Sequence, residues 1–218
     1  MLTATRHLED QMGSAAVLPG VRSNRALARS LLADARDPIR DQVGSLAGEL
    51  HQYLGWLLVA TGHTKQARAE YDAALALGVE IDDPDLTSLA LSYKGHLAWM
   101  LDDPRGTIAL SRGARRDLRV FVGQQAYNAH QEARGWAMTS DPAAVDRTLG
   151  QADKLAVAGQ AERAVAQARQ ALAVCRTTKS TQLAHALHHA HTRMRDVWPT
   201  YPPVRELGDE LRPLSGAR

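Results

Sequence analysis

The sequence predicts an all-α fold, a solenoid in which helices follow one another in pairs. Apolar residues make up 44% of the 218 residues but aromatics only 5%, so Ala and Leu supply the core, as in closely packed helices. The sequence contains neither a sustained two-residue alternation nor an Asn-Gly or Asp-Gly turn, so it offers no signal for a β-hairpin. A pattern of small residues returns at intervals of about 40 residues, a spacing typical of helix-pair repeats.

Prolines punctuate the helical segments and predict where the helices begin. The residue before a proline is disfavoured in a helix, and an Asp at that place can cap the helix that follows. We therefore expect boundaries at Leu18-Pro19-Gly20, Asp37-Pro38, Asp83-Pro84, Asp103-Pro104, Asp141-Pro142 and Tyr201-Pro202-Pro203.

The repeat places a small residue on a first helix, then a turn, then small residues on a returning helix. A helix pair of this kind buries its apolar face only against a neighbouring pair, which predicts a stacked solenoid. The packing positions are Gly55, Gly95 and Ala133, and the turns are Gly62, Asp102-Asp103 and Ser140-Asp141. A fourth, half-present unit contains Gly159, Ala164, Ala168 and Ala171.

The first unit resembles the tetratricopeptide repeat on Leu54-Gly55-x-x-Leu58 followed by Ala67-x-x-x-Tyr71. It departs from that motif at His51, where the repeat has Trp, and at Pro84, which comes late. The resemblance implies a tetratricopeptide-like solenoid, a right-handed α-superhelix whose first helices line a concave groove.

A narrower resemblance extends over most of the chain. The chain is similar to actinobacterial transcriptional regulators, in which an N-terminal helix-turn-helix precedes a tetratricopeptide sensor region. The similar stretches are Ala15-Ala16-Val17-Leu18-Pro19, Tyr53-Leu54-Gly55-Trp56-Leu57, Ala98-Trp99-x-x-x-Asp103-Pro104-Arg105 and Tyr201-Pro202-Pro203-Val204-Arg205-Glu206-Leu207. The resemblance implies a sensor region that reaches DNA only through a domain not present in this chain.

Two departures from these regulators concern the organisation of the chain. The helix-turn-helix is missing upstream, so we expect a sensor fragment, a natural stand-alone relative or an incomplete sequence. A further helix pair is missing near Ala156–Gly159, which indicates a lost repeat or an omitted stretch of sequence. We expect a single domain over residues 1–218, with N-terminal helices over 1–40, repeats over 41–175 and capping helices over 176–218.

Ten residues on one face of the first helices are the predicted ligand-binding site. Rigid aromatic side chains beside hydrogen-bonding groups suit a peptide or a small ligand. For the tryptophans, filling the space between helices is an equal alternative, whereas we favour the groove for the polar residues. The ten residues are Gln52, Tyr53, Trp56, Tyr93, His96, Trp99, Tyr127, His130, Gln131 and Arg134.

A histidine run and an arginine run offer weaker candidates. The imidazoles of His185, His188 and His189 share a helix face and could bind a transition metal, but no carboxylate or thiol lies beside them. We favour a solvated face or a dimer contact there and expect no metal. The arginine run, whose spacing gives one basic helix face, is more typical of a solvated or ion-paired face than of a nucleic-acid contact. It comprises Arg112, Arg115, Arg116 and Arg119.

Enzymatic signals are absent, so we expect no catalytic activity and no cofactor. The sequence contains no Gly-rich phosphate loop and no nucleophile elbow, and its one cysteine, Cys175, lies in an apolar segment that predicts burial. The net charge of +2 and the negative mean hydropathy indicate neither a nucleic-acid-binding surface nor a membrane protein. Without a secretion signal or an apolar span, a cytoplasmic location is expected.

These features predict a module that senses a peptide, a small effector or a protein partner in its groove as part of a transcriptional regulator. Binding would shift the population of superhelix curvatures or of dimer geometries, and we expect a homodimer. The alternative is a stand-alone protein–protein adaptor that holds a partner's peptide without switching.

Overall fold

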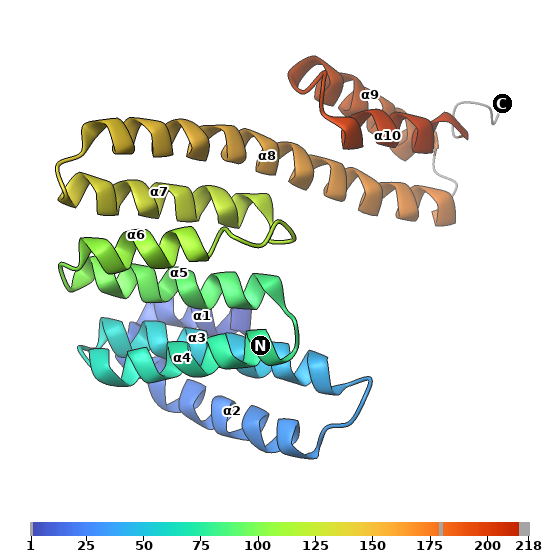
Figure 1. Cartoon of the computed structure of the whole chain (residues 1–218). Coiled ribbons are helices and arrows are strands. Elements are labelled where there is room, and N and C mark those ends of the chain that lie inside the picture. Colours follow the sequence, from blue (N-terminus) through green and yellow to red (C-terminus); the bar gives the residue numbers. More distant parts are fainter. Residues whose placement is uncertain (1, 179–180, 214–218) are drawn as a thin grey trace. The chain divides into compact units, whose positions relative to one another are not determined.

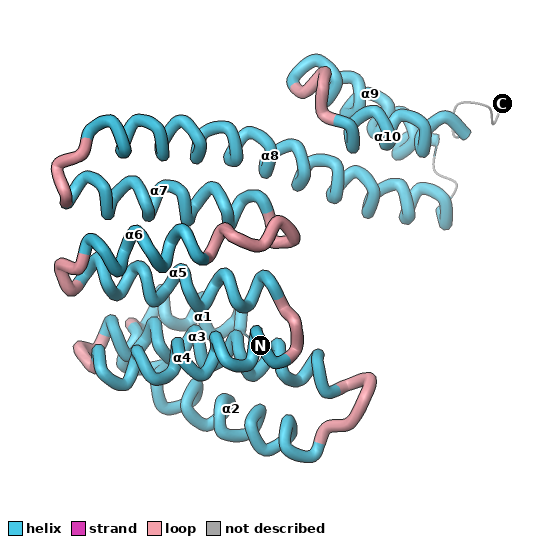
Figure 2. Tube along the Cα trace, viewed as in Figure 1, coloured by secondary structure: helices cyan, strands magenta, loops and turns pink. Residues whose placement is uncertain are grey.

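The computed structural model describes residues 2–178 and 181–213, and these residues form α-helices without a β-strand (Figure 2), which confirms the predicted all-α class. No helix in these ranges is both long enough and apolar enough to cross a membrane. The helices are α1 (Leu2–Met12), α2 (Ser14–Asp34), α3 (Arg40–Ala60), α4 (Thr64–Glu80), α5 (Pro84–Met100), α6 (Pro104–Gly113), α7 (Val122–Met138), α8 (Pro142–Thr178), α9 (Thr181–Val197) and α10 (Pro202–Leu211).

Contacts within the chain form two compact units, Met1–Ala152 and Asp153–Arg218, with the boundary inside α8. The sequence predicts one domain over 1–218, and the difference arises from α8, which is a continuous helix of 37 residues. The half-present repeat and the short junction near Ala156–Gly159 both lie inside this helix, so no turn forms at Gly159.

In the N-terminal unit, each helix from α2 to α6 packs on the next one along the chain (Figure 1). The odd-numbered helices also touch one another directly, α3 against α5 and α5 against α7. The pairs α3–α4 and α5–α6 therefore stack so that α3, α5 and α7 form one layer. This layer carries the residues predicted for ligand binding.

The tight turns between these helices share a left-handed backbone conformation. The φ angles are 81° at Gly62, 49° at Asp82, 58° at Asp102 and 57° at Ser140. Gly adopts this region without a steric cost, and Asp is among the residues that tolerate it as a single residue in a turn. The turns predicted at Gly62, Asp102 and Ser140 are confirmed.

Aspartates begin three of the helices as predicted. The side chains of Asp83, Asp103 and Asp141 each accept a hydrogen bond from the backbone N–H three residues on, at 2.9, 2.8 and 2.9 Å. Each cap satisfies one of the free N–H groups at the start of a helix. The boundary predicted at Tyr201-Pro202-Pro203 is also confirmed, because α10 starts at Pro202.

The boundary predicted at Leu18-Pro19-Gly20 is wrong, because α2 continues through Pro19. Pro19 lacks the N–H that would otherwise bond to the carbonyl one turn earlier, which weakens the helix at this point. Val17 and Val21 flank it, and both are buried in the core of the unit, at 4% and 1% exposure. Burial of this apolar face outweighs the lost hydrogen bond.

The predicted packing positions lie where helices approach closely. A Cβ added at Gly55 would come within 2.3 Å of Cε1 of Tyr71, and one at Gly95 within 2.6 Å of Nε2 of Gln131. Ala133 is 3% exposed. Small residues at these positions allow α3 to meet α4, and α5 to meet α7, as the repeat pattern predicts.

The C-terminal unit has its own apolar core, formed by the end of α8 with α9 and α10. Cys175 is buried in this core, which confirms its predicted role as a small apolar residue. Arg169 on α8 pairs with Glu206 and Glu210 on α10 across the rim of the core. The buried residues are Ala168, Leu172, Cys175, Leu187, Leu207 and Leu211.

The substitution Gly55→Ala should destabilise the N-terminal unit. Alanine gains about 1 kcal/mol of helix propensity, but its Cβ must displace the buried Tyr71 ring, and overpacking costs about 1–3 kcal/mol. We expect a net loss of up to about 2 kcal/mol, measured by urea unfolding.

Gly150→Ala on α8 is the matched control, because nothing lies within 4 Å of an added Cβ there. This variant should be stabilised by up to about 1 kcal/mol. A gain of stability at both positions would contradict the close approach of α3 and α4.

Candidate functional site

Four aromatic rings on α3 and α5 form a continuous row that ends at an arginine of α7. The centroid of Trp56 lies 6.0 Å from that of Tyr93 and 6.1 Å from that of His96. The His96 centroid is 5.4 Å from that of Trp99, and Cζ of Arg134 lies 5.5 Å from the Trp99 centroid. We call these five residues the aromatic row; all of them belong to the predicted site.

The α7 end of the aromatic row is open to solvent. Trp99 is 39% exposed and Tyr127 is 46% exposed, and His130 and Arg134 are exposed as well. Arg134 contacts the Trp99 ring, but none of the described carboxylates forms an ion pair with it. This end therefore offers an aromatic surface beside a cation that lacks an internal counter-ion.

His96 lies in the middle of the aromatic row and is only partly accessible. Burial, with a smaller contribution from the charge of Arg134, lowers the pKa of His96 below its usual value of 6.5, so the ring is neutral at pH 7. Its Nδ1 atom is buried and makes no hydrogen bond. The His96 ring therefore contributes ring contacts to the aromatic row, whereas its Nδ1 atom is shielded from solvent.

The structure places two predicted site residues, Gln52 and Gln131, inside the helix layer rather than on its surface, each at 1% exposure. The amide nitrogen of Gln131 donates to the Ser92 carbonyl at 2.8 Å and to Oγ of Ser111 at 3.0 Å. Gln131 therefore joins α7 to α5 and α6. These glutamines hold the layer together instead of lining its accessible face.

Tyr53 is also buried, at 3% exposure, because α1 lies against it. Its hydroxyl donates to Oε2 of Glu9 at 2.8 Å, and Nε1 of Trp56 donates to Oε1 of Glu9 at 3.1 Å. Cζ of Arg6 lies 5.5 Å from the centroid of the Tyr53 ring. Burial and the Glu9 carboxylate raise the pKa of the Tyr53 hydroxyl, which remains protonated as a donor.

The contact between α1 and α3 could not be predicted from the sequence. No motif distinguishes Leu2–Met12 from an ordinary solvent-exposed helix, and the contact depends on how the chain turns at Gly13. Nothing in the sequence around Glu9 indicates that its carboxylate accepts hydrogen bonds from aromatic side chains of α3.

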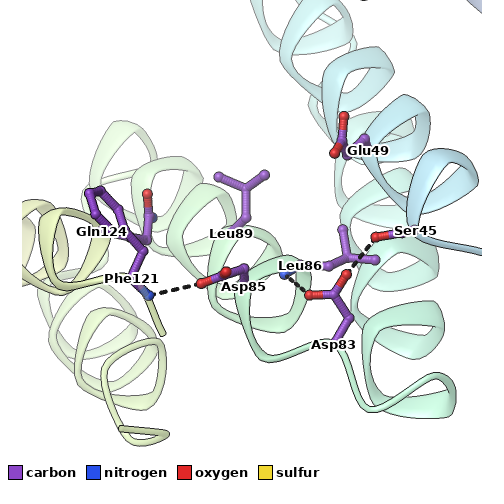
Figure 3. A pocket seen from close by; sticks show the side chains of 8 residues that line it. All are labelled: Ser45, Glu49, Asp83, Asp85, Leu86, Leu89, Phe121 and Gln124. Carbon is purple, nitrogen blue, oxygen red and sulfur yellow. Dashed lines mark hydrogen bonds between the residues drawn. The ribbon is translucent and has the colours of Figure 1, made fainter. Parts of the chain in front are cut away.

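A pocket of about 280 Å³ lies near the N-terminal ends of α3, α5 and α7 (Figure 3), whereas the aromatic row lies nearer the C-terminal ends of these helices. Two of its carboxylates have structural roles: Asp83 accepts from Oγ of Ser45 at 2.5 Å and caps α5, and Asp85 accepts from the backbone N–H of Phe121 at 2.9 Å. Glu49 is exposed, and no hydrogen bond of its carboxylate is found within the described chain. The remaining lining residues are Leu86, Leu89 and Gln124.

The arginine run forms ion pairs at three of its four positions. Arg112 and Arg115 both pair with Glu132 of α7, whose side chain is 4% exposed. Burial by itself would raise the pKa of Glu132, but hydrogen bonds from Arg112, Trp136 and Arg115 together outweigh it and lower that pKa.

The third position, Arg119, bonds to Asp82 and Asp117 at the surface. The expected ion pairing is confirmed for these three residues. The predicted single helix face is wrong, because α6 ends at Gly113 and the other three arginines of the run follow it.

The histidine run lies on α9. His191 bonds to the carbonyl of Val204 at 2.9 Å, and His185 and His189 are exposed. Within residues 2–178 and 181–213, no group of three or more His, Cys, Asp or Glu side chains is arranged to hold a metal ion.

No family model matches this chain, and searches of curated proteins and of solved structures found no match either. The tetratricopeptide and regulator resemblances therefore stay predictions from the sequence.

Glu132→Gln should destabilise the N-terminal unit. The change removes the negative charge that compensates Arg112 and the largely buried Arg115, and breaking a buried ion pair in this way costs on the order of 3 kcal/mol. Urea unfolding measures the loss. Arg116→Gln, at an exposed position of the same segment, is the control and should change stability by less than about 0.5 kcal/mol. Equal stabilities of the two variants would contradict the buried pairing.

Arg134→Gln should raise the pKa of His96, because it removes a positive charge that disfavours the imidazolium form. Burial remains in the variant, so we expect this pKa to stay below 6.5. Titration of the His96 ring signals by NMR measures both values, and Arg116→Gln serves as the control with a distant arginine removed. An unchanged His96 pKa in the Arg134 variant would show that the two side chains do not interact.

Proposed function

We propose that this chain is a helical binding module whose α3, α5 and α7 layer takes a peptide. The observation that carries the proposal is the aromatic row, which is partly exposed and ends at Arg134, a cation without an internal counter-ion. An isolated exposed aromatic residue is ordinary, but a connected row across three helices beside unused polar groups is typical of a recognition surface.

The chemistry of the aromatic row suits a peptide better than a small apolar ligand. Trp56 and Trp99 offer large contact areas at a low cost in side-chain entropy. The guanidinium of Arg134 adds a directional, charged contact that can select a sequence. The row extends along three neighbouring helices, which suits an elongated ligand.

Our preferred biological role is the sensor region of a transcriptional regulator, in keeping with the family resemblance. A peptide that bridges α3, α5 and α7 would favour one curvature of the layer over others, which is a population shift. In this role the chain acts as a homodimer in the cytoplasm, and DNA is bound by a helix-turn-helix domain outside these residues.

A rigid adaptor is the second candidate, and the buried polar contacts of α7 favour it. Gln131 joins α7 to α5 and α6, and Glu132 bonds to Arg112 and Arg115. Such contacts oppose changes in helix arrangement, because moving α7 would expose or unpair buried polar groups. An adaptor would use the same face to hold a partner's peptide without a change of shape.

The proposal is tested by selecting ligands from a library of random peptides displayed on phage, with the full chain as the target. Selected peptides should bind Trp99→Ala and Arg134→Gln at least roughly tenfold more weakly than the unmodified chain, as measured by calorimetry. Arg116→Gln, on another surface, should bind as the unmodified chain does. If the library yields no ligand, or if its ligands bind both aromatic-row variants unchanged, the proposal is wrong.

The two roles differ in the response to a selected peptide. For a sensor, the X-ray scattering profile or the dimer dissociation constant should change when the peptide binds. For an adaptor, both should stay the same.

A further inference from the structure

Helix α1 lies on the binding face but is weakly anchored there. None of its described side chains is buried: Leu2, Thr5 and Glu9 are partly exposed, and Leu8 and Met12 are 44% and 62% exposed. Figure 1 shows α1 behind α3, and the Glu9 carboxylate accepts hydrogen bonds from two side chains of that helix. An amphipathic helix of a compact core normally buries an apolar stripe, whereas on α1 only the partly exposed Leu2 is found packed against the described core.

The Glu9 carboxylate is held by neutral donors. Each of its oxygens accepts from one ring of α3, Oε2 from the Tyr53 hydroxyl at 2.8 Å and Oε1 from Nε1 of Trp56 at 3.1 Å. Ser14, the first residue of α2, adds a bond to Oε1 at 2.7 Å. Tyr53 and Trp56 lie about one turn apart on α3, so their donors converge on a single carboxylate.

The connection between α1 and α2 is a single glycine. Gly13 has a φ of 82°, and an added Cβ would have no atom within 4 Å. This conformation breaks the helix between α1 and α2, and glycine is free to adopt others at little cost. The link therefore permits α1 to leave the face once its contacts with α2, among them the bond from Ser14 to Glu9, are broken.

We propose that the Tyr53 hydroxyl and Nε1 of Trp56 form a carboxylate subsite, that its external ligand is an acidic helical peptide of a partner protein, and that α1 fills this subsite in the free chain. The inference rests on the proposed function, since it names the chemistry that the binding face recognises. Helix α1 is then an internal competitor, which a ligand with a matching acidic residue displaces.

The charges along the face select an acidic ligand. From Trp56 the aromatic row leads through His96 and Trp99 to Arg134, which has no ion-pair partner in the described chain. A peptide with one carboxylate at Tyr53 and Trp56 and further acidic residues toward α7 would meet this cation. Arg6 contacts the Tyr53 ring but belongs to α1 and leaves the face with it.

The test uses two helix-stapled synthetic peptides, one with the sequence of residues 2–12 and one with Glu9→Gln in the same sequence. The target is the full chain carrying Glu9→Ala, in which α1 no longer holds the subsite. The readout is the indole N–H signal of Trp56 in NMR spectra, identified by its loss in Trp56→Phe. The acidic peptide should bind and shift this signal, and the amide peptide should bind roughly ten- to a hundredfold more weakly.

Two further variants test the donor and the competition. Tyr53→Phe in the Glu9→Ala chain keeps the ring but removes the hydroxyl, and should weaken binding of the acidic peptide roughly tenfold. The chain with Glu9 intact should bind the same peptide roughly tenfold more weakly than Glu9→Ala, because α1 competes for the site.

The outcomes separate this inference from the proposed function. Equal affinities of the acidic and amide peptides, or full affinity in Tyr53→Phe, would overturn the carboxylate subsite while leaving the peptide-binding face intact. Failure of both stapled peptides to shift the Trp56 signal would overturn α1 as an internal ligand. The proposed function would then be judged by the library-selected peptides and their dependence on Trp99 and Arg134.

Discussion

The close approach of α3 to α4 at Gly55 is the constraint on which the binding face depends. With no side chain at Gly55, the buried Tyr71 ring of α4 lies directly against α3. The centroid of Tyr71 is 5.7 Å from that of Tyr93, and Tyr93 in turn contacts Trp56. The core packing of the first helix pair therefore supports the aromatic row, so that fold stability and the proposed ligand recognition depend on neighbouring residues.

The far end of the aromatic row is fixed by polar rather than apolar contacts. Arg134 lies two residues after the buried Glu132 and three after Gln131, both of which bind neighbouring helices. Removing either would leave buried polar groups unpaired, which costs more than the loss of an apolar contact of the same size. These contacts fix the position of α7, and with it Arg134, beside Trp99. The guanidinium of Arg134 takes no part in them and remains accessible to a ligand.

Local rules predicted the elements of the fold, and tertiary contacts decided the rest. The turns at Gly62 and Asp102 follow from backbone preferences, and the Asp caps follow from unpaired N–H groups, so both could be read from the sequence. The continuation of α2 through Pro19 could not be read from the sequence, because the burial of Val17 and Val21 outweighs the hydrogen bond that the proline removes. The burial of Gln131 also depends on tertiary contacts. Helical periodicity predicts which residues share a face of α7, but it does not predict which neighbouring helices will cover that face. The contact of Glu9 involves residues more than 40 positions apart, and no local pattern contains it.

The charge distribution along the α3, α5 and α7 layer favours one orientation of a bound peptide. Glu49 precedes Tyr53 by one helical turn and lies at the pocket that also contains Asp85, whereas Arg134 lies at the other end of the aromatic row. An acidic ligand is repelled from the first end and attracted to the second, and the donors of Tyr53 and Trp56 lie between them. Like charges brought together at a recognition surface disfavour the wrong binding mode as effectively as attraction favours the right one. For the proposed acidic peptide, the carboxylate of Glu49 would disfavour the reversed orientation and leave the side facing Arg134 to the acidic residues.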